Sequence, residues 1–145
     1  MSEILDSKMN SSFDGGNLVD HPDYYNNGNI ECIDAMVDAK GWFKTAIFCE
    51  CNDFKYNWRV GYKNPVMQEL GKMAWYISKA EKLWAKAFKW FSPTETKYYA
   101  IVQIVKIKDP KTGVTKDAVL YTDGKEMLVS TLEEFNDEFK LEEDE

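Results

Sequence analysis

The stretch LWAKAFKWFSPTETKYYAIVQIVKI, residues 83–107, contains the change of pattern that decides the fold. Before Pro93 the apolar residues recur every three or four positions, as they do in a helix. From Lys97 they alternate every second position, as they do in a strand. Ser92-Pro93 lies between the two patterns, where a proline interrupts a helix. The sequence therefore predicts an α+β protein, with a helical part followed by a small antiparallel β part.

Upstream of this stretch, the apolar periodicity predicts three helices. The first follows the turn at residues 26–29 and ends near Gly41, the second covers about residues 42–60, and the third covers about residues 65–91. We expect one buried stripe on the second helix and a near-heptad seam on the third. The stripe consists of Ile47, Cys51, Phe54 and Trp58, and the seam consists of Met73, Tyr76, Ala80, Leu83 and Ala87.

Downstream, alternating apolar residues predict four short strands. Thr131, with Glu134 three residues later, has the pattern of a capping box, which predicts a single helical turn before the last strand. Several short antiparallel strands with a helical turn before the last one are typical of a small SH3-like β-barrel. The strands are expected at residues 97–107, 114–121, 125–129 and 139–141.

These patterns predict two domains with different ends. Residues 1–18 are rich in Ser, Asn, Gly and Asp without periodicity, which is typical of a flexible segment. The helical domain is expected at residues 19–92, the SH3-like β domain at residues 96–141, and an acidic tail at residues 142–145.

The net charge of −7 arises at the two ends of the chain. Residues 1–39 and residues 133–145 each contain eight acidic residues and one lysine. Residues 40–91 contain ten basic and four acidic residues, so the middle of the chain is strongly basic. The overall acidity argues against binding to duplex nucleic acid, which needs a basic footprint. A small anionic ligand bound by the basic middle fits this distribution.

The sequence also predicts a cytoplasmic protein that does not contact a membrane. It contains no run of 18 apolar residues, and residues 1–10 lack the apolar core of a signal peptide. Its three cysteines are an odd number without a secretory signal, which favours reduced thiols over a disulfide framework.

One face of the second predicted helix carries groups suited to a phosphate. Asn52, Lys55 and Arg59 lie at positions i, i+3 and i+7, within roughly 60° of one another around the helix axis. A guanidinium fork, an ammonium group and a carboxamide on one face can bind a phosphate together. Phe48 and Tyr56 flank this face and could stack on a base. The alternative is a solvated helix face on which Arg59 pairs with an acid.

Further candidate residues are acidic or titratable. Glu31 and Asp34 lie one helical turn apart, a spacing that can hold Mg²⁺ through oxygen ligands and water, or that simply forms a polar helix face. His21 could donate a proton near neutral pH or anchor its loop. Glu69 and Lys72 flank the buried seam of the third helix, where they could pair with each other or across to Lys55 or Arg59.

Several common catalytic motifs do not occur in the sequence. It has no G-x-x-x-x-G-K-[ST] phosphate loop, no G-x-G-x-x-G fingerprint and no G-x-S-x-G nucleophile motif. If nucleotides bind, side chains from helices must therefore provide most of the contacts.

Four short blocks occur in order over about residues 19–80. They are Asp20-His21-Pro22-x-Tyr24-Tyr25, Gly28-x-Ile30-Glu31-Cys32-Ile33-Asp34, Cys49-x-x-Asn52-x-x-Lys55-Tyr56-x-x-Arg59 and Glu69-Leu70-x-Lys72-x-x-Trp75-Tyr76. This series resembles the small nucleotide-kinase-like family of phage proteins, long filed as a domain of unknown function. The family includes a podovirus coliphage enzyme for dGMP and dTMP that lacks the usual phosphate loop. More weakly, residues 97–141 resemble a small bacterial and phage domain with an SH3-like barrel.

The resemblance implies a helical domain that binds deoxynucleoside monophosphates, uses ATP or another nucleoside triphosphate with Mg²⁺, and forms a homo-oligomer. In such an enzyme, Lys55 and Arg59 would stabilise charge on the transferred phosphoryl group. The catalytic candidates are Lys55, Arg59 and His21, the substrate-binding candidates are Asn52, Tyr56, Phe48, Tyr25, Lys72 and Glu69, and the metal-binding candidates are Glu31 and Asp34.

Three functional hypotheses follow from the residues and the resemblance. The leading one is a phage nucleotide-binding protein that acts as a deoxynucleoside monophosphate kinase in the host cytoplasm. The second is a non-enzymatic phage protein that binds a host protein and inhibits host defence or replication. The third is a Mg²⁺-dependent nucleotide pyrophosphohydrolase, a class that normally needs two acidic motifs where this sequence shows one.

Overall fold

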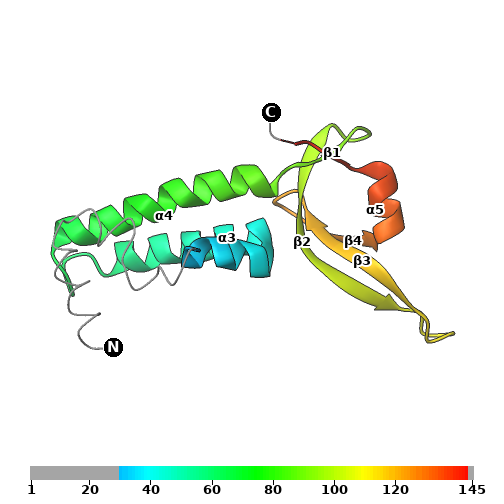
Figure 1. The fold of residues 1–145 in the computed structure, drawn as a ribbon, viewed down its shortest axis with the longest axis horizontal. Helices are drawn as coiled ribbons and strands as arrows, with labels where there is room; N and C mark the ends of the chain where they lie inside the picture. The colour runs from blue at the N-terminus through cyan, green and yellow to red at the C-terminus, as the bar shows by residue number, and fades with distance from the viewer. Residues whose placement is uncertain (1–29, 144–145) are drawn as a thin grey trace. The chain divides into compact units, whose positions relative to one another are not determined.

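The computed structural model describes residues 30–143 of the chain (Figure 1). Helices come first among these residues, an antiparallel sheet follows, and a short helix lies between the last two strands. The predicted α+β class is therefore confirmed. The elements are α3 (Cys32–Trp58), α4 (Val66–Ala87), β1 (Trp90–Ser92), β2 (Lys97–Lys108), β3 (Thr115–Thr122), β4 (Met127–Thr131), α5 (Leu132–Glu138) and β5 (Lys140–Leu141).

The described residues belong to two compact units. The first contains residues 30–40 and 45–82, and the second contains residues 41–44 and 83–143. The first unit is helical, and it carries all the site candidates that lie within the described residues. The second unit contains the five strands and α5. None of the helices in residues 30–143 is long and apolar enough to cross a membrane.

Gly41 divides α3 into two helical segments. Its φ of +86° and ψ of +168° are non-helical, and side chains with a Cβ rarely adopt such a positive φ. The break near Gly41 between the first two helices is thus confirmed, with helical segments at residues 32–40 and 42–58. Gly61 follows the second segment with a φ of +85°, as is common where a helix ends.

The buried face of α3 is not the one that the apolar pattern predicts. Thr45, Cys49 and Tyr56 are buried, together with Ala46 and Asn52. The predicted stripe is exposed instead, and that prediction is wrong. Of its members, Ile47 is 40% exposed, Phe54 67% and Trp58 77%, and Cys51 is exposed as well.

The prediction is wrong because α3 has apolar residues both on the predicted stripe and on the face that contains Cys49 and Tyr56. The face with the small residues Thr45, Ala46 and Cys49 is the one that packs. Small side chains allow another segment to approach closely, and Tyr56 from the same face stacks on Tyr76 of α4. Burial of Cys49 also raises the pKa of its thiol to about 11, so this cysteine remains a neutral packing residue.

Helix α4 ends at Ala87, so the predicted helical end near residue 91 is wrong. Residues 90–92 form β1, which pairs antiparallel with β2 so that Trp90 lies opposite Tyr99. Backbone pairing and the contact of Trp90 with Phe135 override the local helical spacing of the aromatic residues. The predicted seam of α4 is buried at Ala80, Leu83 and Ala87 and half-buried at Met73 and Tyr76.

The five strands form one antiparallel sheet in the order β4-β3-β2-β1-β5. Strands β4 and β5 are its two edges, so the described strands form an open sheet and do not close into the expected barrel. Successive residues of a strand point to opposite faces, and Tyr99 and Ala100 accordingly enter different clusters. One cluster contains Tyr99, Val119, Phe135 and Phe139, and the other contains Phe43, Ala87 and Ala100 with Trp84, Phe88 and Val102 around them.

Helix α5 begins with the predicted capping box. The Thr131 hydroxyl accepts a hydrogen bond from the backbone N–H of Glu134, whose carboxylate accepts one from the backbone N–H of Thr131. The helix presents Phe135 to the sheet, where this ring is 1% exposed and stacks on Phe139.

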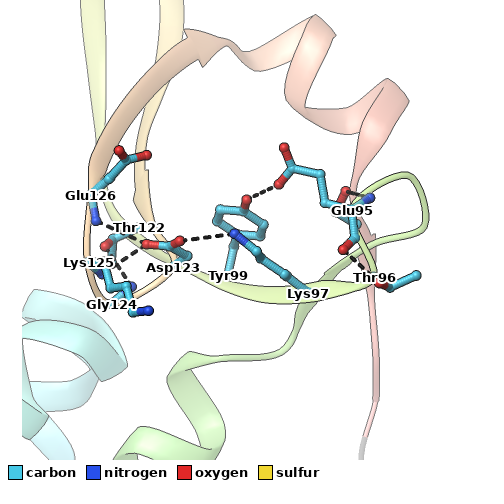
Figure 2. A network of polar contacts seen from close by, with 10 residues as sticks. Glu95, Thr96, Lys97, Tyr99, Thr122, Asp123, Gly124, Lys125 and Glu126 are labelled. Carbon is cyan, nitrogen blue, oxygen red and sulfur yellow. Dashed lines mark hydrogen bonds and ion pairs between the residues drawn. The ribbon is translucent and has the colours of Figure 1, made fainter.

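A polar network joins two loops at the ends of β2 and β3 (Figure 2). Asp123 accepts hydrogen bonds from the backbone N–H groups of Glu126 and Lys125 and pairs with Lys97. The two backbone bonds lower the pKa of Asp123 to about 2. The hydroxyl of Tyr99 donates to Glu95, and this bond together with burial raises the pKa of Tyr99. The network fixes turns of the sheet and uses none of the candidate site residues.

Candidate functional site

The candidate site is built around the ring of Tyr56, in the first unit. Tyr56 comes from α3 and is 7% exposed. Its ring stacks on Tyr76 of α4, with 5.7 Å between the centroids and 18° between the planes. The part of α3 near Tyr56 and the part of α4 near Tyr76 therefore meet at one stacked aromatic pair.

Three cations lie around this ring. The Nζ of Lys55 and the Cζ of Arg59 are each 4.7 Å from the centroid of Tyr56, and the Nζ of Lys72 is 5.4 Å from it. These distances are typical of cation–π contacts, which favour a cation at an aromatic face. We call Lys55, Arg59 and Lys72 the cation cluster. The sequence places Lys72 thirteen or more residues from the other two, and the fold brings it to them.

One buried carboxylate lies beside the cation cluster. The side chain of Glu69 is 0% exposed, and its Oε1 lies 3.3 Å from the Nε of Arg59, whose side chain is 25% exposed. The Nδ2 of Asn64 donates to the same carboxylate over 2.6 Å. Of the two pairings considered for Glu69, the contact with Arg59 is the one present. Arg59 is thus paired with an acid, as the alternative hypothesis for this residue also expected.

The electrostatics of the site reflect an excess of positive charge. Burial lowers the pKa of Lys55, and the neighbouring charges of Arg59 and Lys72 lower it further. Burial alone would raise the pKa of Glu69. Hydrogen bonds from Asn64 and Arg59 outweigh that effect and hold the pKa below its usual range. Glu69 therefore stays ionised, and among the described residues it is the buried anion that pairs with the cation cluster, through Arg59.

The remaining candidates on α3 near Tyr56 are Asn52 and Phe48. Asn52 is on the same face of α3 as Tyr56 and is 8% exposed. Phe48 is 38% exposed, and its edge contacts the ring of Tyr76 at 6.2 Å between centroids. Of the two rings expected to contact a base, Phe48 is thus accessible and Tyr56 is mostly covered.

The acidic candidates lie at the start of α3. Glu31 is the N-cap residue, and Asp34 is in the first turn, where a carboxylate interacts favourably with the helix dipole. Within residues 30–143, no three or more His, Cys, Asp or Glu side chains form a group that could hold a metal ion. No described contact joins Glu31 or Asp34 to the cation cluster. His21 and Tyr25 lie outside the described residues.

Two residues of the site were not among the sequence candidates for it. Asn64 binds Glu69, and Tyr76 provides the ring on which Tyr56 stacks. Asn64 precedes Pro65, and this pair marks only a helix start in the sequence. Tyr76 belongs to the predicted seam of α4, so the sequence predicted that it packs. The sequence did not predict that it packs against Tyr56.

These features define a small α+β protein whose helical unit carries a partly buried cation cluster. Residues 19–78 match the model of a family described as a protein of unknown function (DUF3310). The matched stretch contains the whole cation cluster, Tyr56 and Glu69, and it ends before the sheet. Comparison with curated proteins and with solved structures finds no match.

Proposed function

We propose that the helical unit binds the phosphate groups of a nucleotide, and that the protein is a nucleotide-binding protein with nucleoside monophosphate kinase activity. The observation that carries the proposal is the cation cluster, in which Lys55, Arg59 and Lys72 lie within 5.4 Å of one ring centroid. Glu69 is the single buried carboxylate that pairs with it among the described contacts. A cluster with this charge excess stabilises a bound anion.

The geometry of the cluster favours a phosphate over a compact monovalent anion. One guanidinium and two ammonium groups lie around a single ring, and together such groups can bind different oxygens of one phosphate or of adjacent phosphates. The Tyr56 ring contacts all three cations, and Glu69 holds Arg59 through an ion pair. Such preorganised charge is what phosphoryl transfer requires, because its catalysis consists mainly of positioning and electrostatic stabilisation.

In the proposed reaction, a phosphate oxygen of the nucleoside monophosphate attacks the γ-phosphorus of a nucleoside triphosphate. The bond from that phosphorus to the β,γ-bridging oxygen breaks, and two nucleoside diphosphates result. Lys55 and Lys72 would bind the charged oxygens of the transferred group, and Arg59 would orient it from its position on Glu69. None of these steps needs a nucleophilic side chain of the protein.

Magnesium would enter this reaction with the triphosphate. Glu31 and Asp34 supply two carboxylates one turn apart, which is fewer ligands than a complete all-protein site needs. Mg²⁺ is commonly bound by one or two carboxylates together with substrate phosphates, and this shared role is the one that the proposal gives to Glu31 and Asp34. When bound, the ion would neutralise charge on the phosphate oxygens.

Isothermal titration calorimetry of the full chain tests the binding step. The ligands are the deoxynucleoside monophosphates, a nucleoside triphosphate with Mg²⁺, and inorganic pyrophosphate. We expect Lys72→Met to weaken binding about tenfold or more, since a charge-assisted hydrogen bond contributes roughly 1.5–3 kcal/mol. Lys82→Met is the matched control, because Lys82 is an exposed residue of the same helix outside the cluster.

Two outcomes would contradict the proposal at different levels. The absence of heat and of thermal stabilisation with every ligand would remove nucleotide binding itself. Binding that Lys72→Met and Lys82→Met weaken equally would remove the assignment to the cluster. If binding is confirmed, a coupled assay for diphosphate formation from each deoxynucleoside monophosphate and ATP then tests the kinase activity.

A further inference from the structure

Three exposed aromatic residues follow one another at every fourth position from the end of α3 into the turn after it. They are Phe54, Trp58 and Tyr62, which are 67%, 77% and 89% exposed. The rings of Phe54 and Trp58 stack on each other, with centroids 6.1 Å apart and planes 19° apart. We call these three residues the aromatic row. Contiguous exposed apolar surface of this kind marks an interaction site.

A basic residue directly follows each member of the aromatic row. These basic residues are Lys55, Arg59 and Lys63. Residues 54–68 contain no acidic residue, so no neighbour in the sequence offsets the three charges. Besides burial and the cation cluster, the charge of Lys63 lowers the pKa of Lys55, so these two ammonium groups lie close enough to interact. The aromatic row is therefore accompanied by positive charge along its length.

Lys55 connects the aromatic row to the cation cluster. An open hollow of about 280 Å³ is lined by Phe54, Lys55 and Trp58. Pockets for whole small molecules have roughly 300–1,000 Å³, so this hollow has the size for one planar ring system. Around the helix axis Lys55 lies about 60° from Trp58 and about 40° from Arg59. A base in the hollow and a phosphate at the cation cluster can therefore belong to one strand.

A single strand of nucleic acid presents the two kinds of group that this surface matches. Its bases have free faces that stack on aromatic side chains, and its phosphates follow a basic surface. From the alternation of exposed aromatic and basic residues we propose that the aromatic row and the basic residues beside it bind single-stranded nucleic acid, with about one base on each ring. Stacking and phosphate contacts do not use the sugar 2′ position, so DNA and RNA strands bind alike.

Charge complementarity selects this occupant over an apolar protein surface. Such a surface would cover the rings of the aromatic row but would give the ammonium groups of Lys55 and Lys63 no anion. A nucleic acid duplex would supply phosphates, but its bases are already stacked on one another and leave the rings uncovered. The proposal shares with the proposed function only the binding of phosphate by the cation cluster, and it requires no nucleotide substrate.

Fluorescence anisotropy of a labelled oligothymidylate of about 15 nucleotides, titrated with the full chain, tests the binding. We expect a dissociation constant on the order of 1–100 µM at physiological salt, as for other binding without sequence preference. Trp58→Ala should weaken binding roughly fivefold to hundredfold, and Trp58→Phe should recover most of the loss because it keeps a ring. Trp42→Ala is the matched control, because Trp42 is a 43% exposed tryptophan of α3 outside the aromatic row. Circular dichroism checks that all variants keep their helices.

The salt dependence of binding tests the basic residues separately. The logarithm of the binding constant falls linearly with the logarithm of the salt concentration, by about 0.7 for each phosphate neutralised on a single strand. Lys63→Met should therefore make this slope shallower by about 0.7, and Lys82→Met, an exposed lysine of α4, should leave it unchanged. A general loss of stability would not change the slope of Lys63→Met alone.

Four outcomes would overturn the proposal. They are the absence of an anisotropy change up to hundreds of micromolar protein, equal losses in Trp58→Ala and Trp42→Ala, equal slopes in Lys63→Met and Lys82→Met, and binding of a duplex of the same length as tightly as the single strand. Calorimetry with dTMP separates this proposal from the proposed function. Binding of dTMP without binding of the oligonucleotide would overturn only the present proposal. Binding of the oligonucleotide without binding of any mononucleotide would support it and contradict the proposed function.

Discussion

Replacing Glu69 by Gln removes the only buried charge paired with the cation cluster among the described contacts while keeping nearly the same shape. Loss of one partner from a fully buried pair costs about 3–5 kcal/mol, and a surface pair contributes about 0–1 kcal/mol. The Glu69–Arg59 pair is intermediate between a fully buried pair and a surface pair, because the Glu69 side chain is 0% exposed and the Arg59 side chain is 25% exposed. We therefore expect Glu69→Gln to lower the free energy of unfolding by about 2 kcal/mol.

The measurement is urea unfolding at pH 7, followed by circular dichroism, with the midpoint and slope fitted separately. Glu81→Gln serves as the control, because Glu81 is an exposed residue of the same helix and should change stability by less than about 0.5 kcal/mol. A double-mutant cycle with Arg59→Met isolates the pair itself. If Glu69 acts through Arg59, the two single losses should add up to clearly more than the loss in the double variant.

The pH dependence gives an independent check with a defined sign. The folded-state pKa of Glu69 lies below its ordinary value of 4.5. Its stabilising contribution is therefore fully present above about pH 4.5 and is lost as the pH falls through the folded-state pKa. The stability difference between the wild type and Glu69→Gln should shrink over that range. A difference below about 0.5 kcal/mol at pH 7, or one that does not change on acidification, would refute the reasoning.

Three other predictions concern the scaffold. Gly41→Ala should destabilise the protein by about 2 kcal/mol in urea unfolding, although no atom lies within 4 Å of the added Cβ, because the φ of +86° itself excludes alanine. Thr131→Ala should cost about 1 kcal/mol, and Thr131→Ser should recover most of it, since only the serine keeps the capping oxygen of α5. Asp123 has a pKa lowered from 3.8 to about 2, so its contribution is present above pH 3.8 and lost toward pH 2. Melting temperatures of Asp123→Asn and the wild type should accordingly differ at pH 6 and converge near pH 2.

The sequence predicts most of this fold because the local signals are strong. A period of two with well-marked turns defines β2, β3 and β4, and a capping box defines α5. Strand β1 escaped prediction because it has only three residues, and its aromatic side chains continue the helical spacing of α4. Residues 90–92 form a strand because they pair with β2, and pairing between two segments produces no periodic pattern in the sequence of either one.

The spatial arrangement of the candidate residues was predictable in part for a similar reason. Helical spacing on α3 placed Asn52, Lys55 and Arg59 on one face, and the structure places two further candidates, Lys72 and Glu69 of α4, beside Lys55 and Arg59. The buried face of α3 was predicted on the wrong side because the more apolar residues were assumed to be covered. The face with small side chains is the one that packs. When both faces of a helix carry apolar residues, the sequence pattern alone does not show which face is buried.

The wrong prediction for the buried face of α3 has its physical origin in the helix itself. A helix that carries apolar residues on two faces has two stripes in its sequence pattern. On α3 the stripe with Cys49 and Tyr56 supports the cation cluster from within, and the stripe with Phe54 and Trp58 remains outside. Lys55 lies between the two stripes in the sequence and around the helix. Lys55 therefore lies at the border of the packed face, which is why its side chain is exposed while its Nζ still lies 4.7 Å from the centroid of the Tyr56 ring.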